Sequence, residues 1–207
     1  MKLYGFGPTR SLRVLWILRE LEVDFELVEV DGRKGEHRRP EFLALNPAGK
    51  LPVFVDGDLV LTESVAIVLY LAEKFPARGL LPAGLRARAE TYRWLFFTAT
   101  ELEQPVWRIQ RHTVGYAAEK RIPAEIALAR QDFIDMAAVM ERHMEGRPFL
   151  VGDDVTVADF IAAYTLDMAT MVQLLEGFPN LRAYLERMYA RPRAPDRIVQ
   201  AFAKLSA

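Results

Sequence analysis

Short apolar blocks separated by turn residues fill the first third of the chain. Leu3 to Phe6 is an apolar run that ends at Gly7-Pro8, which predicts a strand followed by a loop. Apolar residues then recur at helical spacing from Val14 to Leu21, and Phe25 to Val30 alternates like a half-buried strand. The pattern therefore predicts strand, helix, strand.

A hairpin and a second helix follow. Val53 to Val55 and Leu59 to Leu61 flank Asp56-Gly57-Asp58, a loop of the length and composition that closes a hairpin. Thr62-Glu63-Ser64 then opens a helix that is apolar nearly all round from Val65 to Leu71, which predicts a buried element. The order βαβ and then ββα is the thioredoxin-like arrangement.

The rest of the chain reads as helices. Pro76 ends the first domain (residues 1–76), and residues 77–84 are rich in glycine and proline and form a linker. Residues 85–207 contain no strand pattern and predict an all-helical domain. Its expected helices are 87 to about 111, 123–144, 157–175 and 181–189. Thr156 and Asp159 fit a capping box, although Asp replaces the more usual Glu or Gln.

Composition narrows the chemistry. The chain has 207 residues and no cysteine, which excludes disulfides, thiolate metal sites and a protein cysteine nucleophile. Its net charge is -1, so we expect no nucleic-acid partner. No signal-peptide pattern and no apolar run of about 20 residues is found, so we expect a cytoplasmic protein without a membrane segment.

The stretch from Asn46 to Ser64 carries most of the functional information. Pro52 lacks a backbone N–H, which predicts an edge strand or a cis bond and leaves the Leu51 backbone open to pair with a ligand. The buried helix end at Ser64 suits a carboxylate, and the neighbouring Glu63 suits a cation. Together they describe a site for the zwitterionic head of an amino acid. The alternative is that Thr62 or Ser64 merely caps the helix.

These residues resemble the glutathione site of the cytosolic glutathione transferases, in Lys50-Leu51-Pro52 followed by Glu63-Ser64. The resemblance covers essentially the full length and implies the glutathione transferase fold. It also implies that Leu51, beside a cis Pro52, pairs with the cysteinyl backbone. Glu63 and Ser64 would then hold the γ-glutamyl end.

The other end of glutathione would lie at His37 and Lys50. Their spacing resembles the theta class, in which a histidine and a lysine hold the glycine carboxylate. The alternative is that the charged span from Arg33 to Arg39 is a solvated loop.

The group that activates the thiol is less clear. Only about 3% of glutathione is thiolate at pH 7, and lowering its pKa by about two units needs about 2.7 kcal/mol. The resemblance to serine-type classes places the activating hydroxyl in the loop after the first strand, where an ungapped count reaches Pro8, which cannot donate. A one-residue deletion places Thr9 there. Thr9 is therefore our first choice, with Ser11 and the charge of Arg10 as alternatives.

The electrophile pocket is expected between that loop and the long helix after the linker. Phe6 and Gly7 would form one wall, and Trp107, Arg108 and Arg111 fall where the family lines this pocket. Trp107 is equally consistent with core packing. Inward-facing arginines would favour an anionic or carbonyl-bearing electrophile.

The sequence therefore predicts a glutathione transferase of a bacterial, theta-like or unclassified type. Glutathione would be its co-substrate, a small apolar electrophile its second substrate, and no metal would be needed. The resemblance also implies a homodimer. A glutathione-dependent isomerase or dehalogenase of the zeta kind remains open, as does a non-enzymatic regulatory or assembly module on the same fold.

Overall fold

The computed structural model describes residues 1–205, which divide into two compact units. Unit one comprises Met1–Leu81 together with the C-terminal segment from Arg191, and unit two comprises Pro82–Ala190. Within the described residues, no helix combines the length and the apolar character that crossing a membrane requires.

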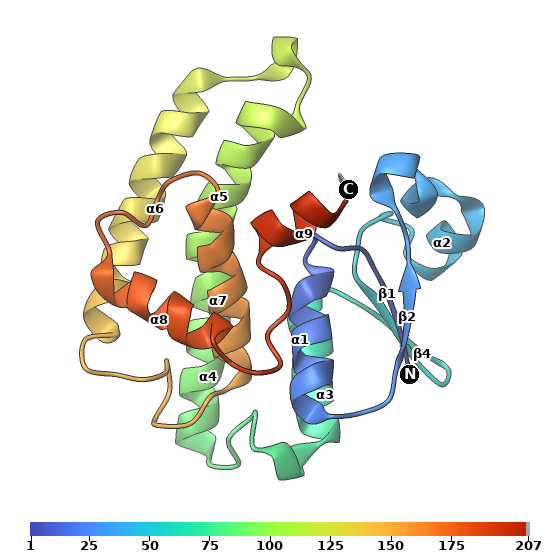
Figure 1. The fold of residues 1–207 in the computed structure, drawn as a ribbon, viewed down its shortest axis with the longest axis horizontal. Helices are drawn as coiled ribbons and strands as arrows, with labels where there is room; N and C mark the ends of the chain where they lie inside the picture. Colours follow the sequence, from blue (N-terminus) through green and yellow to red (C-terminus); the bar gives the residue numbers. More distant parts are fainter. Residues whose placement is uncertain (206–207) are drawn as a thin grey trace. The chain divides into compact units, whose positions relative to one another are not determined.

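Unit one is built on a four-stranded mixed sheet (Figure 1). The strands are β1 (Lys2–Gly5), β2 (Glu26–Glu29), β3 (Val53–Asp56) and β4 (Leu59–Thr62). Their order in the sheet is β2-β1-β3-β4, with β1 and β2 parallel and the other pairs antiparallel. The thioredoxin-like arrangement predicted from the sequence is confirmed.

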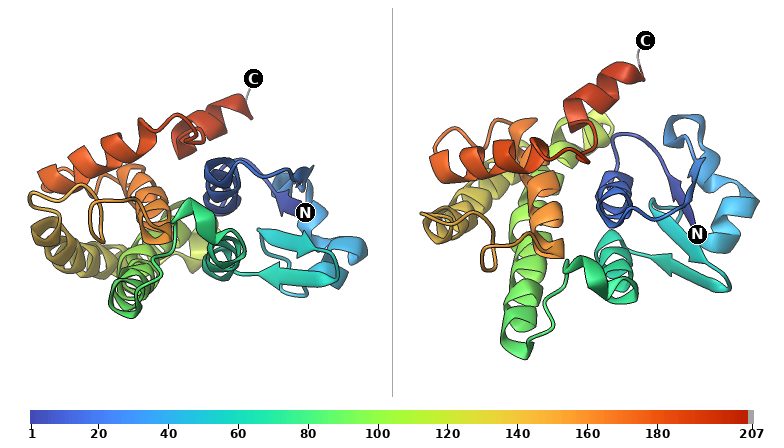
Figure 2. Two further views of the ribbon diagram at one scale, coloured as in Figure 1. Left: turned by 90° about the horizontal axis from the view of Figure 1, so that it is seen from below. Right: turned by 60° about the horizontal axis from the view of Figure 1, so that its bottom comes forward.

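Helices cover both faces of this sheet, as the two views of Figure 2 show. Helix α1 (Ser11–Leu21) and helix α3 (Ser64–Lys74) pack against each other on one face, where Trp16, Ile67 and Leu71 are fully buried. The remaining helical segments are η1 (Gly32–Lys34), η2 (Glu36–Arg38), α2 (Pro40–Leu45), η3 (Pro76–Arg78) and α9 (Ile198–Lys204). The sequence pattern did not predict α2, because its six residues are too few to show a helical period.

The C-terminal segment groups with unit one, whereas the sequence placed it in the helical domain. Arg191 donates two hydrogen bonds to the carboxylate of Glu20 on α1, at 2.9 and 2.8 Å. Arg193 forms an ion pair with Glu22, the residue that ends the same helix. These long-range ion pairs leave no periodic signal in the sequence.

Unit two is helical throughout. Its segments are α4 (Leu85–Phe97), η4 (Thr98–Leu102), α5 (Glu103–Gln110), η5 (Arg111–Gly115), η6 (Ala118–Lys120), α6 (Pro123–His143), α7 (Val157–Thr170) and α8 (Pro179–Tyr189). The long helix predicted to follow the linker is present, but it contains two wider π-helical turns, η4 and η5. Helix α7 ends at Thr170, before the predicted 175, and Gln173 beyond it has a positive φ of 57°.

Asp159 ties the start of α7 to its surroundings. Its fully buried carboxylate accepts hydrogen bonds from the backbone N–H groups of Leu150 (2.9 Å) and Thr156 (2.8 Å). It also accepts from the hydroxyl groups of Thr156 (3.0 Å) and Tyr184 (2.8 Å). The predicted capping box is therefore present, and the same carboxylate joins it to α8.

Removing this carboxylate should destabilise the protein strongly. We expect Asp159→Ala to lower the free energy of unfolding by about 3 kcal/mol or more, because several buried donors lose their acceptor together. Urea denaturation monitored by circular dichroism measures the change. The exposed Asp154 offers a matched control, since Asp154→Ala should cost less than about 0.5 kcal/mol. A loss below about 1 kcal/mol for Asp159→Ala would contradict this assignment.

Candidate functional site

The strand register brings four segments to one edge of the sheet. Tyr4 of β1 pairs with Val53 of β3, and Val53 pairs in turn with Thr62 of β4. The end of β1, the start of β3 and the end of β4 therefore meet at the same edge. Gly5 pairs with Glu29 at the end of the parallel strand β2, and the Val30 N–H still donates to Gly5 O at 3.0 Å. The segments that adjoin this edge, including the first residue of α3, contain every residue that the sequence predicted for glutathione binding.

The N-terminus of α3 lies at this edge. Glu63 is the N-cap residue, with φ 67° and ψ 110°, and its exposed side chain makes no capping hydrogen bond. The first intrahelical bond runs from the Ile67 N–H to Glu63 O at 3.0 Å, so the N–H groups of residues 64–66 point out of the helix end. A positive φ at a residue other than glycine is unfavourable and is common at ligand sites.

Ser64 follows as the first residue of α3 and is only 5% exposed. Its Oγ accepts a hydrogen bond from Nη1 of Arg13 at 3.2 Å. Thr62 belongs to β4 and Ser64 is the first residue of α3, so Glu63 between them, and neither of the two hydroxyl residues, occupies the N-cap position. The Ser64 hydroxyl is thus placed for something other than capping.

Leu51 and Pro52 lead into β3. The peptide bond between them is cis, one of the two geometries expected from the sequence, and β3 itself is an interior strand. Pro52 precedes the paired residues, so its missing N–H costs the sheet no hydrogen bond. The half-buried Leu51 has no backbone hydrogen-bond partner among residues 1–205.

Asn46 holds the turn before this segment. Its Oδ1 accepts from the Ala48 N–H at 3.1 Å, and its Nδ2 donates to Lys50 O at 2.8 Å. Gly49 has φ 59°, and a Cβ there would lie 3.0 Å from the backbone oxygen of His37, so the position favours glycine. The turn fixes the backbone of Lys50 and leaves its exposed ammonium without an ion pair among the described residues.

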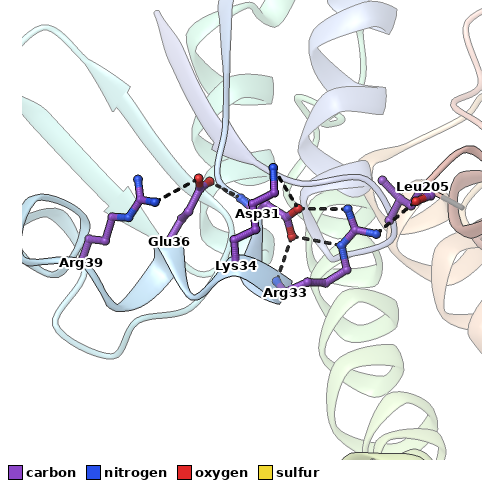
Figure 3. A network of polar contacts seen from close by, with 6 residues as sticks. All are labelled: Asp31, Arg33, Lys34, Glu36, Arg39 and Leu205. Carbon is purple, nitrogen blue, oxygen red and sulfur yellow. Dashed lines mark hydrogen bonds and ion pairs between the residues drawn. The ribbon is translucent and has the colours of Figure 1, made fainter. Parts of the chain in front are cut away.

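The loop after β2 is organised by Asp31 (Figure 3). Its carboxylate accepts from the backbone N–H of Arg33 at 2.8 Å and from the Arg33 guanidinium at 3.1 and 2.9 Å. The hydrogen bond from Arg33 lowers the pKa of Asp31. The Asp31 N–H donates to Glu36 at 2.7 Å, and Glu36 pairs with Arg39 at 3.4 Å. The span is therefore an ordered loop.

His37 lies within this loop and is half-buried. Its Nδ1 is buried and has no hydrogen-bond partner in the described part of the chain. The ring packs close to Gly32, where an added Cβ would lie 3.5 Å from this nitrogen. The imidazole is therefore held in the loop while a polar atom remains unsatisfied.

The loop after β1 contains the three candidates for thiol activation. The Thr9 hydroxyl donates to Phe6 O at 2.7 Å and lies 2.8 Å from the hydroxyl of Ser11. Because a hydroxyl has one proton, Ser11 donates to Thr9 when Thr9 donates to Phe6. Ser11 also accepts from the Phe6 N–H at 3.4 Å and is buried against Gly5, where a Cβ would lie 2.7 Å from Ser11 Cβ. Arg10 lies between the two hydroxyl residues and is half-buried.

Arg33 connects this loop to the C-terminal segment of unit one. Its guanidinium lies over the Phe6 ring, with Cζ 5.2 Å from the ring centroid, and Nη1 donates to Leu205 O at 3.3 Å (Figure 3). Phe6 and Gly7 are both half-buried.

The electrophile residues predicted in unit two lie on α5 and η5. Arg108 is bound by two carboxylates of α6, Glu125 at 2.9 Å and Asp132 at 2.5 Å. The Arg111 guanidinium lies over Tyr116, 4.4 Å from its ring centroid, and 5.8 Å from that of Trp107. Trp107 is 36% exposed, so it is not a core residue.

Sequence reasoning missed Arg13 and the role of Asn46. Arg13 is 1% exposed within the apolar stripe of α1, and a charged residue inside such a stripe is the signal that could have identified it. Asn46 was included in the stretch but not assigned a function.

Known proteins match this chain over both of its parts. Residues 1–73 match the family described as glutathione S-transferase, N-terminal domain, and residues 123–187 match glutathione S-transferase, C-terminal domain. Glutathione S-transferase F9 of Arabidopsis thaliana is 35% identical over 201 residues, 93% of each chain. The disulfide-bond oxidoreductase YfcG of Escherichia coli is 32% identical over 206 residues, 95% of this chain and 94% of that protein.

A solved structure agrees with these sequence matches. The glutathione transferase URE2P8 of Phanerochaete chrysosporium, solved with oxidized glutathione, superposes with a TM-score of 0.87 at 25% identity. The superposition covers 100% of this chain and 96% of that chain.

Proposed function

Because the chain belongs to the glutathione S-transferase family, we propose that unit one binds glutathione along the sheet edge described above and activates its thiol for attack on an apolar electrophile. The observation that supports this most directly is the convergence of the loops after β1, β2 and β4 with the residues before β3. Glutathione has a zwitterionic head, a central cysteine and a terminal carboxylate, and the edge offers complementary groups for each.

The γ-glutamyl head would bind at α3. The exposed carboxylate of Glu63 has no ion-pair partner within residues 1–205 and suits the ammonium group. The Ser64 hydroxyl and the outward N–H groups of residues 64–66 suit the carboxylate.

The cysteinyl and glycyl residues of glutathione would extend from the γ-glutamyl site at α3. The open backbone of Leu51 would pair with the cysteinyl residue in the manner of an added strand. His37 and Lys50 would hold the glycine carboxylate, which is supported by the buried Nδ1 of His37, unpartnered across the described residues, and by the exposed ammonium of Lys50. The sulfur would then face the loop after β1.

We propose Thr9 as the group that stabilises the thiolate. Its hydroxyl would exchange the bond to Phe6 O for one to the sulfur, while Ser11 continues to donate to Thr9 Oγ1. Ser11 is buried, which favours a role in holding the Thr9 hydroxyl over direct contact with the sulfur. The positive charge of Arg10 is the second alternative for stabilising the thiolate. The thiolate would attack an electrophilic carbon and form a C–S bond. In a substitution the carbon–halogen bond breaks and the halide leaves with its electron pair, whereas in an addition the double bond of the electrophile breaks and the atom that receives its electron pair takes a proton from water.

The residues proposed for the electrophile belong to both units. Phe6 and Gly7 belong to unit one, and Trp107, Arg108 and Arg111 belong to unit two. Arg111 is a better candidate than Arg108 for contact with an anionic electrophile, because two carboxylates already neutralise Arg108.

We further propose a homodimer, as implied by the family. Two large apolar side chains of α4 support it: Leu85 is 85% exposed and Phe96 is 57% exposed. The similarity to enzymes over nearly the full length does not favour the non-enzymatic module considered from the sequence.

A second candidate function is glutathione-dependent disulfide reduction. It is favoured by the Escherichia coli relative named a disulfide-bond oxidoreductase and by the solved complex of a similar protein with oxidized glutathione. This chain has no cysteine, so two glutathione molecules would supply both electrons, release two substrate thiols and become oxidized glutathione. We expect turnover of hydroxyethyl disulfide with glutathione if this function is present. Conjugation of chloronitrobenzene without any disulfide turnover would exclude it.

Glutathione binding tests the proposal as a whole. Calorimetric titration should show binding at millimolar glutathione or below, and Ser64→Ala should weaken it about 10- to 100-fold, the effect of one hydrogen bond to a charged group. Thr100→Ala, which removes an exposed hydroxyl of unit two, should leave affinity unchanged. Absence of binding by the parent protein would overturn the proposal.

The role of Thr9 has its own test. Thr9→Val removes the hydroxyl at nearly constant volume and should raise the pKa of bound glutathione by about one unit or more, since a unit corresponds to about 1.4 kcal/mol. Ultraviolet absorbance of the thiolate measures this pKa, and conjugation of chloronitrobenzene should slow about 10-fold. Thr9→Ser, which keeps the hydroxyl, should retain most of both properties. An unchanged pKa in Thr9→Val would transfer the role to Ser11, Arg10 or backbone N–H groups.

A further inference from the structure

Arg13 and Ser64 link two helices beneath the proposed γ-glutamyl site. Arg13 lies on α1 and is 1% exposed, and its Nη1 donates to Ser64 Oγ at 3.2 Å. Ser64 is the first residue of α3 and is 5% exposed. A permanently charged guanidinium is thus placed directly behind the serine of the site.

This contact determines whether the Ser64 hydroxyl donates or accepts a hydrogen bond toward a ligand. A hydroxyl can donate one hydrogen bond and accept two. Arg13 occupies an acceptor position of Ser64 Oγ, and the Ser64 proton has no acceptor within residues 1–205. The proton is therefore available to a ligand at the N-terminus of α3, where the N–H groups of residues 64–66 also point outward.

We propose that Arg13 is a positioning residue that makes Ser64 a dedicated donor to the α-carboxylate of the γ-glutamyl group. This inference rests on the proposed glutathione site. The guanidinium polarises the hydroxyl, which strengthens the hydrogen bond that Ser64 gives to an anion. Its charge also disfavours an ammonium group at Ser64, so the ammonium is directed to Glu63. Arg13 thereby fixes the orientation of the zwitterionic head without touching it.

The test separates the two charges of that head with two analogues of glutathione. Glutaryl-Cys-Gly keeps the carboxylate and lacks the ammonium, whereas γ-aminobutyryl-Cys-Gly keeps the ammonium and lacks the carboxylate. We expect Arg13→Met to lower the affinity for glutathione and for glutaryl-Cys-Gly about 10-fold. The affinity for γ-aminobutyryl-Cys-Gly should change less than 2-fold. Titration calorimetry measures all three, with competition against glutathione for the weakest ligand.

Coupling with Ser64 gives an independent readout. The double variant of Arg13→Met and Ser64→Ala should lose clearly less glutathione affinity than the product of the two single losses, because both changes act on one hydrogen bond. Arg13→Lys keeps the charge and should retain part of the affinity. Circular dichroism establishes whether Arg13→Met folds. If it does not, Arg13→Lys takes its place in the comparison.

The control is Arg19→Met, the same substitution at an exposed position of α1, which should leave all three affinities unchanged. If the Arg13 variants weaken the binding of all three ligands equally, Arg13 only supports the fold. The same follows if the losses of glutathione affinity in the Arg13 and Ser64→Ala variants multiply in the double variant. Either result would overturn the inference while the glutathione site stands. Absence of glutathione binding by the parent protein would remove the proposed function itself.

Discussion

The pairing of β3 with both β1 and β4 is the constraint on which the site depends. Val53 faces Tyr4 on one side and Thr62 on the other, so a single register positions the loop after β1, the residues before β3 and the start of α3. A slip of one residue would turn the buried Val53 and Phe54 to opposite faces, which the core opposes. The burial of apolar side chains therefore maintains the spacing between polar groups that lie outside the core.

The four strands of unit one and its helices α1 and α3 could be predicted from sequence, because each has a local signal. The alternation of β2, the Asp-Gly-Asp turn and the apolar run of α3 are visible without any tertiary contact. The return of the C-terminal segment to unit one could not be predicted, since it depends on Arg191 reaching Glu20 across 171 residues. Likewise, the spacing predicted Ser64 as a site residue but not Arg13, because their contact spans 51 residues.

Glutathione binding and thiol activation, the two roles proposed for unit one, differ in how firmly the structure supports them. The groups proposed for binding are presented by backbone that the sheet, α3, the Asn46 turn or the loop organised by Asp31 holds in place. The thiol-activating group depends instead on the rotation of one hydroxyl that already has an acceptor at Phe6 O. Small changes in the loop after β1 would thus alter reactivity while leaving recognition of glutathione intact. This separation would allow one fold to carry different chemistries on the same co-substrate.

The role proposed for Glu63 would set selection for function against selection for stability at one position. At φ 67° a residue with a side chain is less favourable than glycine by about 1 kcal/mol, so glycine would stabilise the fold at this position. Glycine would also remove the carboxylate of the N-cap residue of α3. A stability screen that ignores glutathione would therefore select against Glu63, and position 63 would gain stability at the expense of binding.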